Sequence, residues 1–333
     1  TARDRPGDDH GDATRQPREV RSYEVEYVGG LWHADYHHGS LKVLTAAGAW
    51  VTPVLLAFLD DHSRLCCHAQ WYLAETAGTF VHGLCQAIQK RGLPRALLTD
   101  NGGPMTAAET CEGLVRLGIS QATTLPFAPY QNGKQEVLWA QVEGRLLAML
   151  EGLAAELRLD HLNEATQAWV EFEYHRKPHT ETGQTPLARF LAGPEVLRPS
   201  PSADALRTAF TTEQGRTQRR SDGTITVEGV RFEVPARFAH LRRLAIRYVR
   251  WDLSSVLLCE RRTGSVIGTL YPLDKTRNAD AVRRPLGPPS TSAPVRAATG
   301  VAPLLDALLR QARATGLPPA YLPTTDPTPE PDR

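Results

Sequence analysis

The chain has 333 residues, of which 41% are hydrophobic and 23% are charged. This length exceeds that of an average domain, so we expect two domains with tails. No apolar run reaches the ~18 residues that a membrane-spanning helix needs. The polar stretch 1–21 also lacks the pattern of a secretory signal. The composition therefore excludes a protein that crosses a membrane by helices.

The charge is nearly balanced overall, with 38 Lys and Arg against 37 Asp and Glu, but it is unevenly distributed. Residues 31–150 contain eight basic and nine acidic side chains, whereas residues 215–285 contain fifteen basic and seven acidic ones. A basic segment beside a segment that carries functional carboxylates indicates a polyanionic partner. A solvated basic face is the alternative.

The cysteines exclude two kinds of small scaffold. Their number is odd and no two of them form a Cys-x-x-Cys pair. Neither a disulfide framework nor a zinc knuckle fits this pattern. A reducing cytoplasm is therefore the expected location. The five residues are Cys66, Cys67, Cys85, Cys111 and Cys259.

The first half of the chain predicts an α/β domain behind a disordered arm at 1–25. Three successive strand-like runs suggest an antiparallel meander, and alternating helices and strands follow. This order predicts a mixed five-stranded sheet with helices packed on it. The expected strands are 31–36, 51–59, 65–73, 95–99 and 119–125, and the expected helices are 76–91, 107–117 and 134–157.

The second half predicts a small all-β barrel at 215–285, reached through two further helices and a linker at 196–214. The tail at 286–333 is expected to be flexible, with one amphipathic helix at 301–315. That helix has two open roles: docking on a partner or packing on the barrel. The expected helices are 162–174 and 185–191, and the barrel strands are 223–235, 241–248, 255–261 and 266–271.

Three acidic residues stand in positions that suit catalysis. Asp100 ends a buried strand-like run and is followed by a turn at Asn101 and Gly102. Glu136 opens the long helical pattern, and 35 residues lie between these two acids. Asp35 lies in another strand-like run. Two strand ends and one helix can converge on one point, an arrangement that suits divalent metal ions and phosphodiester chemistry.

Five motifs in this order resemble one known family. They are Trp32-His-Ala-Asp35, Asp60-Asp61-His-Ser-Arg64, Leu98-Thr-Asp100-Asn-Gly, Gly133-Lys-Gln-Glu136, and Tyr174-His-Arg-Lys-Pro-His179 followed by Thr185-Pro186. With the 35-residue spacing, they resemble the DDE transposase and retroviral-type integrase superfamily. The resemblance implies an RNase H-like catalytic core at 26–195. Residues 215–285 look like the C-terminal barrel of Mu-type bacterial transposases.

The resemblance implies an enzyme that cleaves DNA ends and joins them to target DNA during transposition. Asp35, Asp100 and Glu136 would be catalytic and would hold two Mg²⁺ ions, with Mn²⁺ as a substitute. Asp35 would bridge both ions, while Asp100 and Glu136 would each hold one. The implied partners are double-stranded DNA, further copies of this chain, and an accessory ATPase or targeting protein. The implied location is the bacterial cytoplasm, at the nucleoid when the protein is bound to DNA.

Other side chains receive secondary roles. Asn132 and Lys134 precede the catalytic helix and are expected to contact DNA. Asp60 and Asp61 are expected to shape a turn. We expect three histidines near Asp35 to lie at an exposed strand edge. The arginines expected to grip phosphates are Arg219, Arg220, Arg242, Arg243, Arg247, Arg261 and Arg262. The expected exposed histidines are His33, His37 and His38.

Three like charges at one site should repel each other and raise the pKa of at least one carboxyl group.

Two alternative functions remain open. One is a catalytically inactive DNA-binding or assembly protein of a transposition system. The other is a plain metal-dependent nuclease, which would use water and not a DNA 3′-hydroxyl as its nucleophile.

Overall fold

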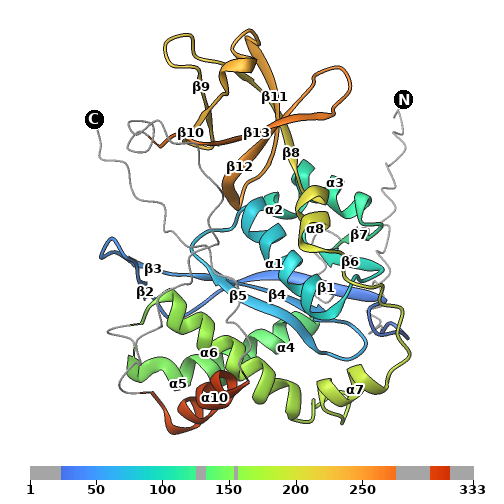
Figure 1. The fold of residues 1–333 in the computed structure, drawn as a ribbon. Helices are drawn as coiled ribbons and strands as arrows, with labels where there is room; N and C mark the ends of the chain where they lie inside the picture. Colours follow the sequence, from blue (N-terminus) through green and yellow to red (C-terminus); the bar gives the residue numbers. More distant parts are fainter. Residues whose placement is uncertain (1–23, 125–132, 154–156, 275–300, 316–333) are drawn as a thin grey trace, which may run out of the picture.

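A computed structural model describes residues 24–124, 133–153, 157–274 and 301–315 (Figure 1). The arm expected at 1–25 and the tail expected at 286–333 lie mostly outside these residues. In the part of the chain that the structure describes, no helix is both long and apolar enough to cross a membrane.

The core is a five-stranded mixed sheet in the order β5-β4-β1-β6-β7. The first three strands in sequence are antiparallel neighbours, and β6 and β7 continue the sheet in parallel with β1. This order confirms the expected RNase H-like architecture. The strands are β1 (Leu31–His38), β4 (Val54–Asp60), β5 (Cys66–Tyr72), β6 (Ala96–Thr99) and β7 (Ser120–Thr123).

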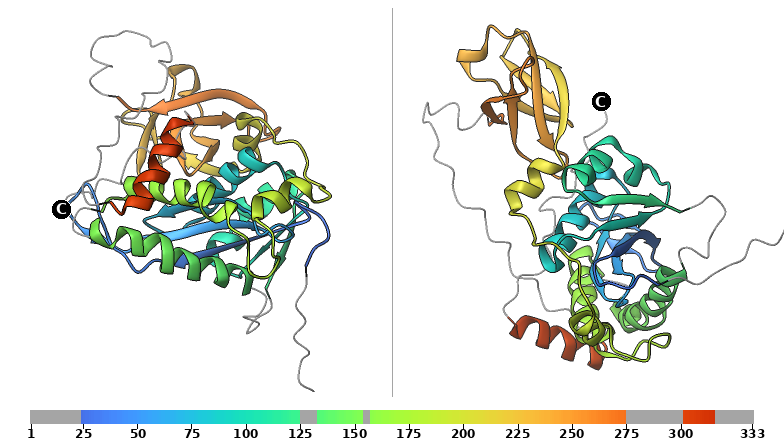
Figure 2. Two further views of the ribbon diagram at one scale, coloured as in Figure 1. Left: turned by 90° about the horizontal axis from the view of Figure 1, so that it is seen from below. Right: turned by 90° about the vertical axis from the view of Figure 1, so that its right-hand side faces the viewer.

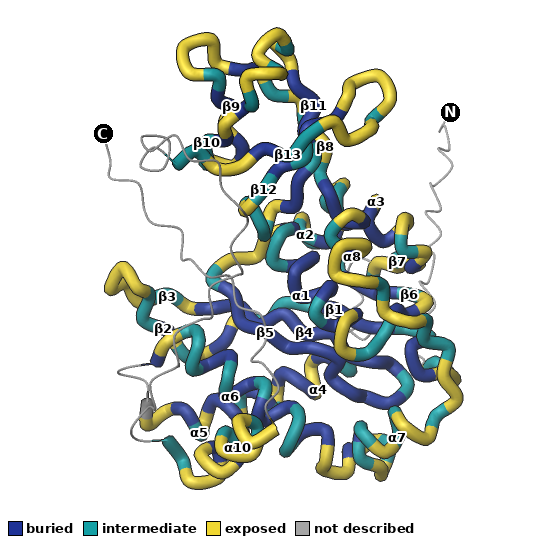
Figure 3. Tube along the Cα trace, in the orientation of Figure 1, coloured by how far each residue is buried: buried dark blue, intermediate teal, exposed yellow. Residues whose placement is uncertain are grey.

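Helices cover both faces of this sheet (Figures 1 and 2). Each face has its own apolar cluster, so β4 and β5 are buried along their whole length (Figure 3). One face carries α1 (Ala77–Arg91), α2 (Gly103–Thr106), α3 (Ala108–Arg116) and α8 (Ala203–Ala209). The other carries α4 (Gly133–Gln141), η2 (Val142–Leu147), α5 (Ala148–Leu150), η3 (Glu151–Leu153), α6 (Leu159–Phe172) and α10 (Pro303–Ala314).

Three local features depart from the sequence-based expectations. The long helix after Gly133 contains a π-helical segment, η2, in its middle. A short hairpin of β2 (Val43–Leu44) and β3 (Trp50–Val51) stands where no strand pair was expected. The stretch 196–214 holds α8 and the first residues of β8 in addition to irregular chain. The Pro- and Ser-rich composition of this stretch favours a linker and not a helix. The hydroxyl of Ser202 nevertheless caps α8 by accepting from the Ala205 N–H at 3.2 Å.

Two short helices complete the core after α6. They are η4 (Tyr174–Arg176) and α7 (Pro186–Ala192). The hydroxyl of Thr185 accepts a hydrogen bond from the Ala188 N–H at 3.1 Å, and Pro186 occupies the first turn of α7. This is the N-cap and proline arrangement that the sequence indicates.

The second unit is a nearly closed antiparallel barrel with its own apolar cluster. Its strand order is β8-β11-β12-β13-β10-β9. The guanidinium of Arg216 on β8 donates to the Thr226 carbonyl on β9 at 3.1 Å, which links the two ends of the sheet. The elements are β8 (Thr212–Thr217), β9 (Thr224–Val227), β10 (Val230–Glu233), η5 (Ala236–Phe238), β11 (Arg243–Val249), β12 (Asp252–Cys259) and β13 (Val266–Pro272).

Helix α10 packs on the core and not on the barrel (Figure 2). Its side chains Leu305 and Leu308 are buried in the apolar cluster beneath α6. The guanidinium of Arg313 pairs with both carboxylate oxygens of Glu164 on α6, at 2.6 and 3.0 Å. The expected helix is therefore confirmed, and the alternative that it packs on the barrel is wrong.

Candidate active site

Asp35 and Asp100 come together because their strands are parallel neighbours. In the register of β1 and β6, Leu31 lies opposite Ala96 and His33 opposite Leu98. Continuing this register by two residues sets Asp35 level with Asp100, where β6 ends. Both side chains are half-buried. Two carboxylates therefore lie side by side where β6 ends beside the middle of β1.

The surroundings of Asp35 disfavour its charged form. Burial is the main cause and the negative charge of Asp100 adds to it, so the pKa of the Asp35 carboxyl rises to about 6. The Tyr36 N–H donates to Asp35 Oδ1 at 2.8 Å and the Trp139 side chain also forms a hydrogen bond with Asp35, which opposes the rise. The expected repulsion between converging carboxylates is confirmed for this pair.

A tight turn holds the Asp100 carboxylate. The Gly102 N–H donates to Asp100 Oδ1 at 2.8 Å. A Cβ atom at position 102 would stand 2.9 Å from the same oxygen, closer than real Cβ contacts allow. Glycine at this position therefore lets the backbone approach the carboxylate.

Glu136 lies in the first turn of α4 and is exposed. The neighbouring Gln135 is buried, and its side-chain amide donates to the carbonyl of Ala57 at 3.3 Å. Ala57 is the residue of β4 that pairs with Asp35. The start of α4 thus lies over the site. However, no group of three His, Cys, Asp or Glu side chains within the described residues is arranged to hold a metal ion. The register of β1 and β6 brings Asp35 and Asp100 together, while the Glu136 carboxylate is exposed on α4.

Asp60 and Asp61 serve the fold, as expected. Asp60 Oδ1 accepts from the backbone and hydroxyl of Ser63 at 2.9 and 2.6 Å, and Asp60 Oδ2 accepts from the Gly29 N–H at 2.7 Å. Asp61 accepts from His33 Nε2 at 2.6 Å and from the Lys134 ammonium. Burial alone would raise the pKa of Asp61, but hydrogen bonds from His33, Lys134 and the Val25 N–H outweigh it and hold the pKa at about 2.

The expectation of exposed histidines is wrong for two of the three. His33 is fully buried against Asp61. His37 is only 23% exposed, because it pairs with Glu143 and stacks on Trp139. His38 is exposed, as expected. The alternation of His33, Asp35 and His37 on one face of a strand was the signal in the sequence that could have revealed their shared surroundings.

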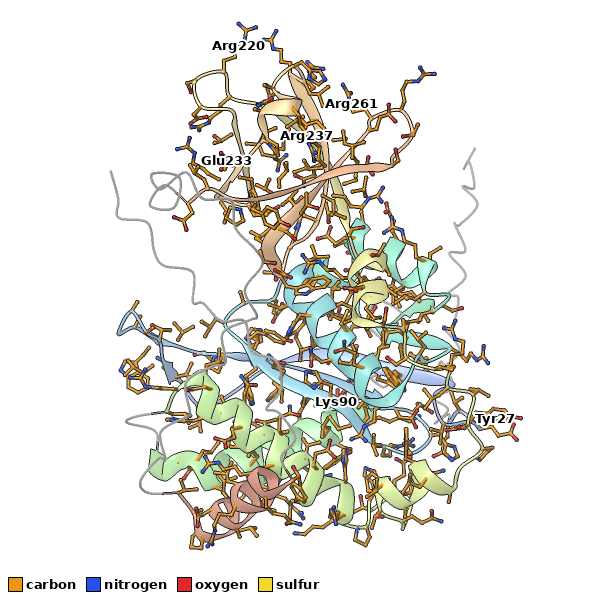
Figure 4. The ribbon with its side chains drawn as sticks, in the orientation of Figure 1. Tyr27, Lys90, Arg220, Glu233, Arg237 and Arg261 are labelled. Carbon is orange, nitrogen blue, oxygen red and sulfur yellow. The ribbon has the colours of Figure 1, made fainter. Side chains whose placement is uncertain are left out.

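The predicted DNA-contacting residues have different environments. Asn132 lies outside the described residues, and the Lys134 ammonium is paired with Asp61. Arg247 is partly buried and pairs with Glu213 at 3.1 Å. The other six predicted arginines are exposed. Figure 4 shows Arg220 at the end of the barrel that is far from the core sheet. An open depression of about 610 Å³ on the barrel is lined by Thr217, His240, Leu241, Arg242, Arg243 and Arg261.

The donor set at the Asp35–Asp100 edge fits a divalent cation. Hard cations such as Mg²⁺ prefer carboxylate oxygens and keep several waters, so a few carboxylates suffice. Burial and, after it, the negative charge of Asp100 raise the pKa of Asp35, and a bound cation would favour its ionised form. Glu136 would join this set only from its exposed position on α4.

Comparison with known proteins gives a consistent picture. No family model matches the chain. A segment of 106 residues, 32% of this chain, is 31% identical to part of the Gag-Pro-Pol polyprotein of bovine leukemia virus (isolate Australian). The chain matches only 7% of the length of that polyprotein.

The structural neighbours of the chain include retroviral integrase catalytic cores. The HTLV-2 core, solved with magnesium, is 18% identical, with a TM-score of 0.39 over 49% of this chain and 97% of that one. The BIV core is 24% identical, with a TM-score of 0.38 over 49% and 94% of the two chains. A chain of the simian T-cell lymphotropic virus intasome is 17% identical, with a TM-score of 0.46 over 77% and 81%. These TM-scores are low, so we assign the fold from strand order and packing.

Proposed function

We propose that the chain is a DDE-type polynucleotidyl transferase that cleaves DNA ends and transfers them to target DNA. One observation carries the proposal: Asp35 on β1 lies beside Asp100 at the end of β6. Burial and repulsion from Asp100 raise the pKa of Asp35 there. The ordered motifs of the sequence and the RNase H-like strand order support it. The matched viral polyprotein segment is in keeping with it.

Asp35, Asp100 and Glu136 would hold two Mg²⁺ ions. When bound, these ions would activate an oxygen nucleophile and stabilise the leaving 3′-oxygen. Asp35 has contacts on two sides. Asp100 lies beside it on β6, and the side chain of Trp139 on α4 forms a hydrogen bond with it. Glu136 would complete the set from the first turn of the same helix. The exposed arginines of the barrel would hold the DNA phosphates without reading sequence.

The resemblance adds partners to this proposal. Two DNA ends must be processed together, so several copies of the chain would assemble on DNA. An accessory ATPase or targeting protein would act beside them. The bacterial cytoplasm remains the expected location.

The first experiment measures Mn²⁺-dependent nicking of supercoiled plasmid by the chain and by its Glu136→Gln and Asp35→Asn variants. We expect nicking that requires metal and disappears in both variants. Glu164→Gln on α6 is a matched control, because that residue pairs with Arg313 away from the site. Equal nicking by all four proteins would contradict the site assignment. A labelled oligonucleotide with a free 3′-hydroxyl then separates strand transfer from hydrolysis by a plain nuclease.

One observation favours a second candidate function. The Glu136 carboxylate is exposed, and within the described residues no three acidic, His or Cys side chains are arranged to hold a metal ion. A chain that keeps the fold without an assembled site would be a DNA-binding or assembly protein. In that case, the plasmid would be bound by wild type and variants alike and nicked by none of them.

A further inference from the structure

The strand that carries Asp35 also carries a histidine two residues to either side of it. Side chains at alternate positions of a strand lie on one face, so His33, Asp35 and His37 share the face that lies toward α4. The intervening Ala34 and Tyr36 pack into or against the cluster on the α1 side of the sheet. Both histidines are therefore placed between β1 and the helix of Glu136.

His33 connects this strand to the start of α4. Its Nε2–H donates to Asp61 Oδ1 at 2.6 Å, and both side chains are fully buried. The ammonium of Lys134 donates to the same oxygen. Lys134 is the second residue of α4 and stands two residues before Glu136. Removing one partner of a buried ion pair costs about 3–5 kcal/mol, so this connection is hard to break.

His37 connects the strand to the far part of the same helix. Its Nε2–H donates to Glu143 Oε1 at 2.8 Å, and its ring stacks on Trp139 at 5.1 Å between centroids with 13° between planes. The Ser40 hydroxyl donates to Glu143 Oε2 at 2.5 Å. Glu143 lies in the π-helical segment η2, a distortion that is often found at functional sites.

We propose that these two contacts form a clamp that positions Glu136 for the acids on the sheet. The clamp consists of His33–Asp61–Lys134 at the start of α4 and His37–Glu143 in η2. The Glu136 carboxylate forms no hydrogen bond or ion pair with another described residue, so its place is set by the helix that carries it. The clamp members are positioning residues. The inference rests on the proposed function, because it assigns them a purpose at that site.

The first test needs neither metal nor DNA. Hydrogen exchange of the α4 amides is compared in wild type, Glu143→Gln and the control Glu164→Gln. Each change removes the negative charge of one carboxylate that contacts a basic side chain and keeps the side-chain shape. We expect exchange in α4 to rise roughly 10-fold in Glu143→Gln and to stay unchanged in the control. Unchanged exchange in α4 of Glu143→Gln would overturn the clamp. Asp61→Asn breaks the other contact and repeats the test if Glu143→Gln does not fold.

The second test asks whether the clamp acts through Glu136. Mn²⁺ affinity is measured for Glu143→Gln in the wild-type and Glu136→Gln backgrounds. We expect about 10-fold weaker binding in the first, as for other residues that orient metal ligands, and no further loss in the second. Equal losses in both backgrounds would overturn a positioning role. A wild-type chain that binds no Mn²⁺ would contradict the proposed function, while the exchange test would still decide the clamp.

Discussion

At the scale of single residues, buried titratable groups set how the stability of the core depends on pH. His82 on α1 is almost fully buried, and its Nδ1 lies 2.8 Å from the hydroxyl oxygen of Tyr72 on β5. Burial disfavours the imidazolium and lowers the pKa of His82 to about 4 from 6.5. Its contribution to stability is therefore present above about pH 6.5 and is lost as the pH falls toward 4.

The loss of stability on acidification predicts the behaviour of His82→Gln. The side-chain oxygen of this glutamine can still accept a hydrogen bond from the Tyr72 hydroxyl. Between pH 7 and pH 5, the wild-type free energy of unfolding should fall by about 2 kcal/mol more than that of the variant. Urea unfolding of both proteins at the two pH values measures this. The same pH dependence in the two proteins would show that His82 is not the group that titrates.

Arg64 is the largest charged side chain in the buried interior. It is 1% exposed and reaches carboxylates of Glu24 and Glu181, each at 3.1 Å. The hydroxyl of Tyr174 donates to the Arg64 carbonyl at 2.8 Å, so the residue ties the β4–β5 turn to the end of α6. The carboxylates of Glu24 and Glu181 are partly exposed, which reduces the stabilisation that each ion pair with Arg64 contributes.

We expect Arg64→Ala to lower the free energy of unfolding by about 2–4 kcal/mol, since it leaves a cavity and removes ion pairs to Glu24 and Glu181, of which Glu24 keeps Arg189 as a partner. The matched control is Arg310→Ala, because Arg310 is 72% exposed and pairs with Asp306 of the same helix, α10. That control should cost less than about 0.5 kcal/mol. Denaturant unfolding compares the two variants, and equal losses would contradict the role of Arg64.

At the scale of elements, α10 stands out because it returns to the core after the barrel. An amphipathic helix of 12 residues is marginal alone in water, so tertiary packing must hold it. Leu305 and Leu308 supply that packing, whereas Leu304 on the same helix is 50% exposed.

Leu305→Ala should therefore loosen the docking of α10, while Leu304→Ala should not. A buried Leu→Ala change costs about 2–5 kcal/mol, which would raise amide exchange in α10 and leave the strands of the core unaffected. Hydrogen exchange of both variants checks this. Faster exchange through the whole core would instead show that α10 unfolds only together with the domain.

At the scale of the whole molecule, the candidate catalytic acids and the predicted DNA-contacting arginines lie in different units. Asp35, Asp100 and Glu136 belong to the core, and six of the predicted arginines are exposed on the barrel. Arg242 and Arg261 line its open depression, and Figure 4 shows Arg261 on the barrel. This separation fits one unit that holds a polyanion while the other acts on it.

We expect the double variant Arg242→Glu and Arg261→Glu to bind duplex DNA more weakly at low salt. The slope of log affinity against log salt should become shallower by roughly 1 for each phosphate that the variant no longer binds. The matched control is Arg310→Glu, which reverses a charge on α10, outside the barrel. It should leave the slope of log affinity against log salt unaltered. An unaltered slope in the double variant would show that this face does not hold DNA.

The sequence by itself determined the order of elements and, from it, a mixed five-stranded sheet, since period-2 and helical patterns, turn residues and ordered motifs depend on neighbours in the chain. It also predicted Asp35, Asp100 and Glu136 as acids that converge on one point, and the register of β1 and β6 sets the first two level. The structure alone decided which side chains surround them. The sequence predicted His33 and His37 as strand-edge residues. In the structure, Asp61 contacts His33, while Trp139 and Glu143 contact His37. Such contacts join residues far apart in sequence, so no local pattern encodes them. The docking of α10 on α6 and the exposed position of Glu136 were decided in the same way, by tertiary packing.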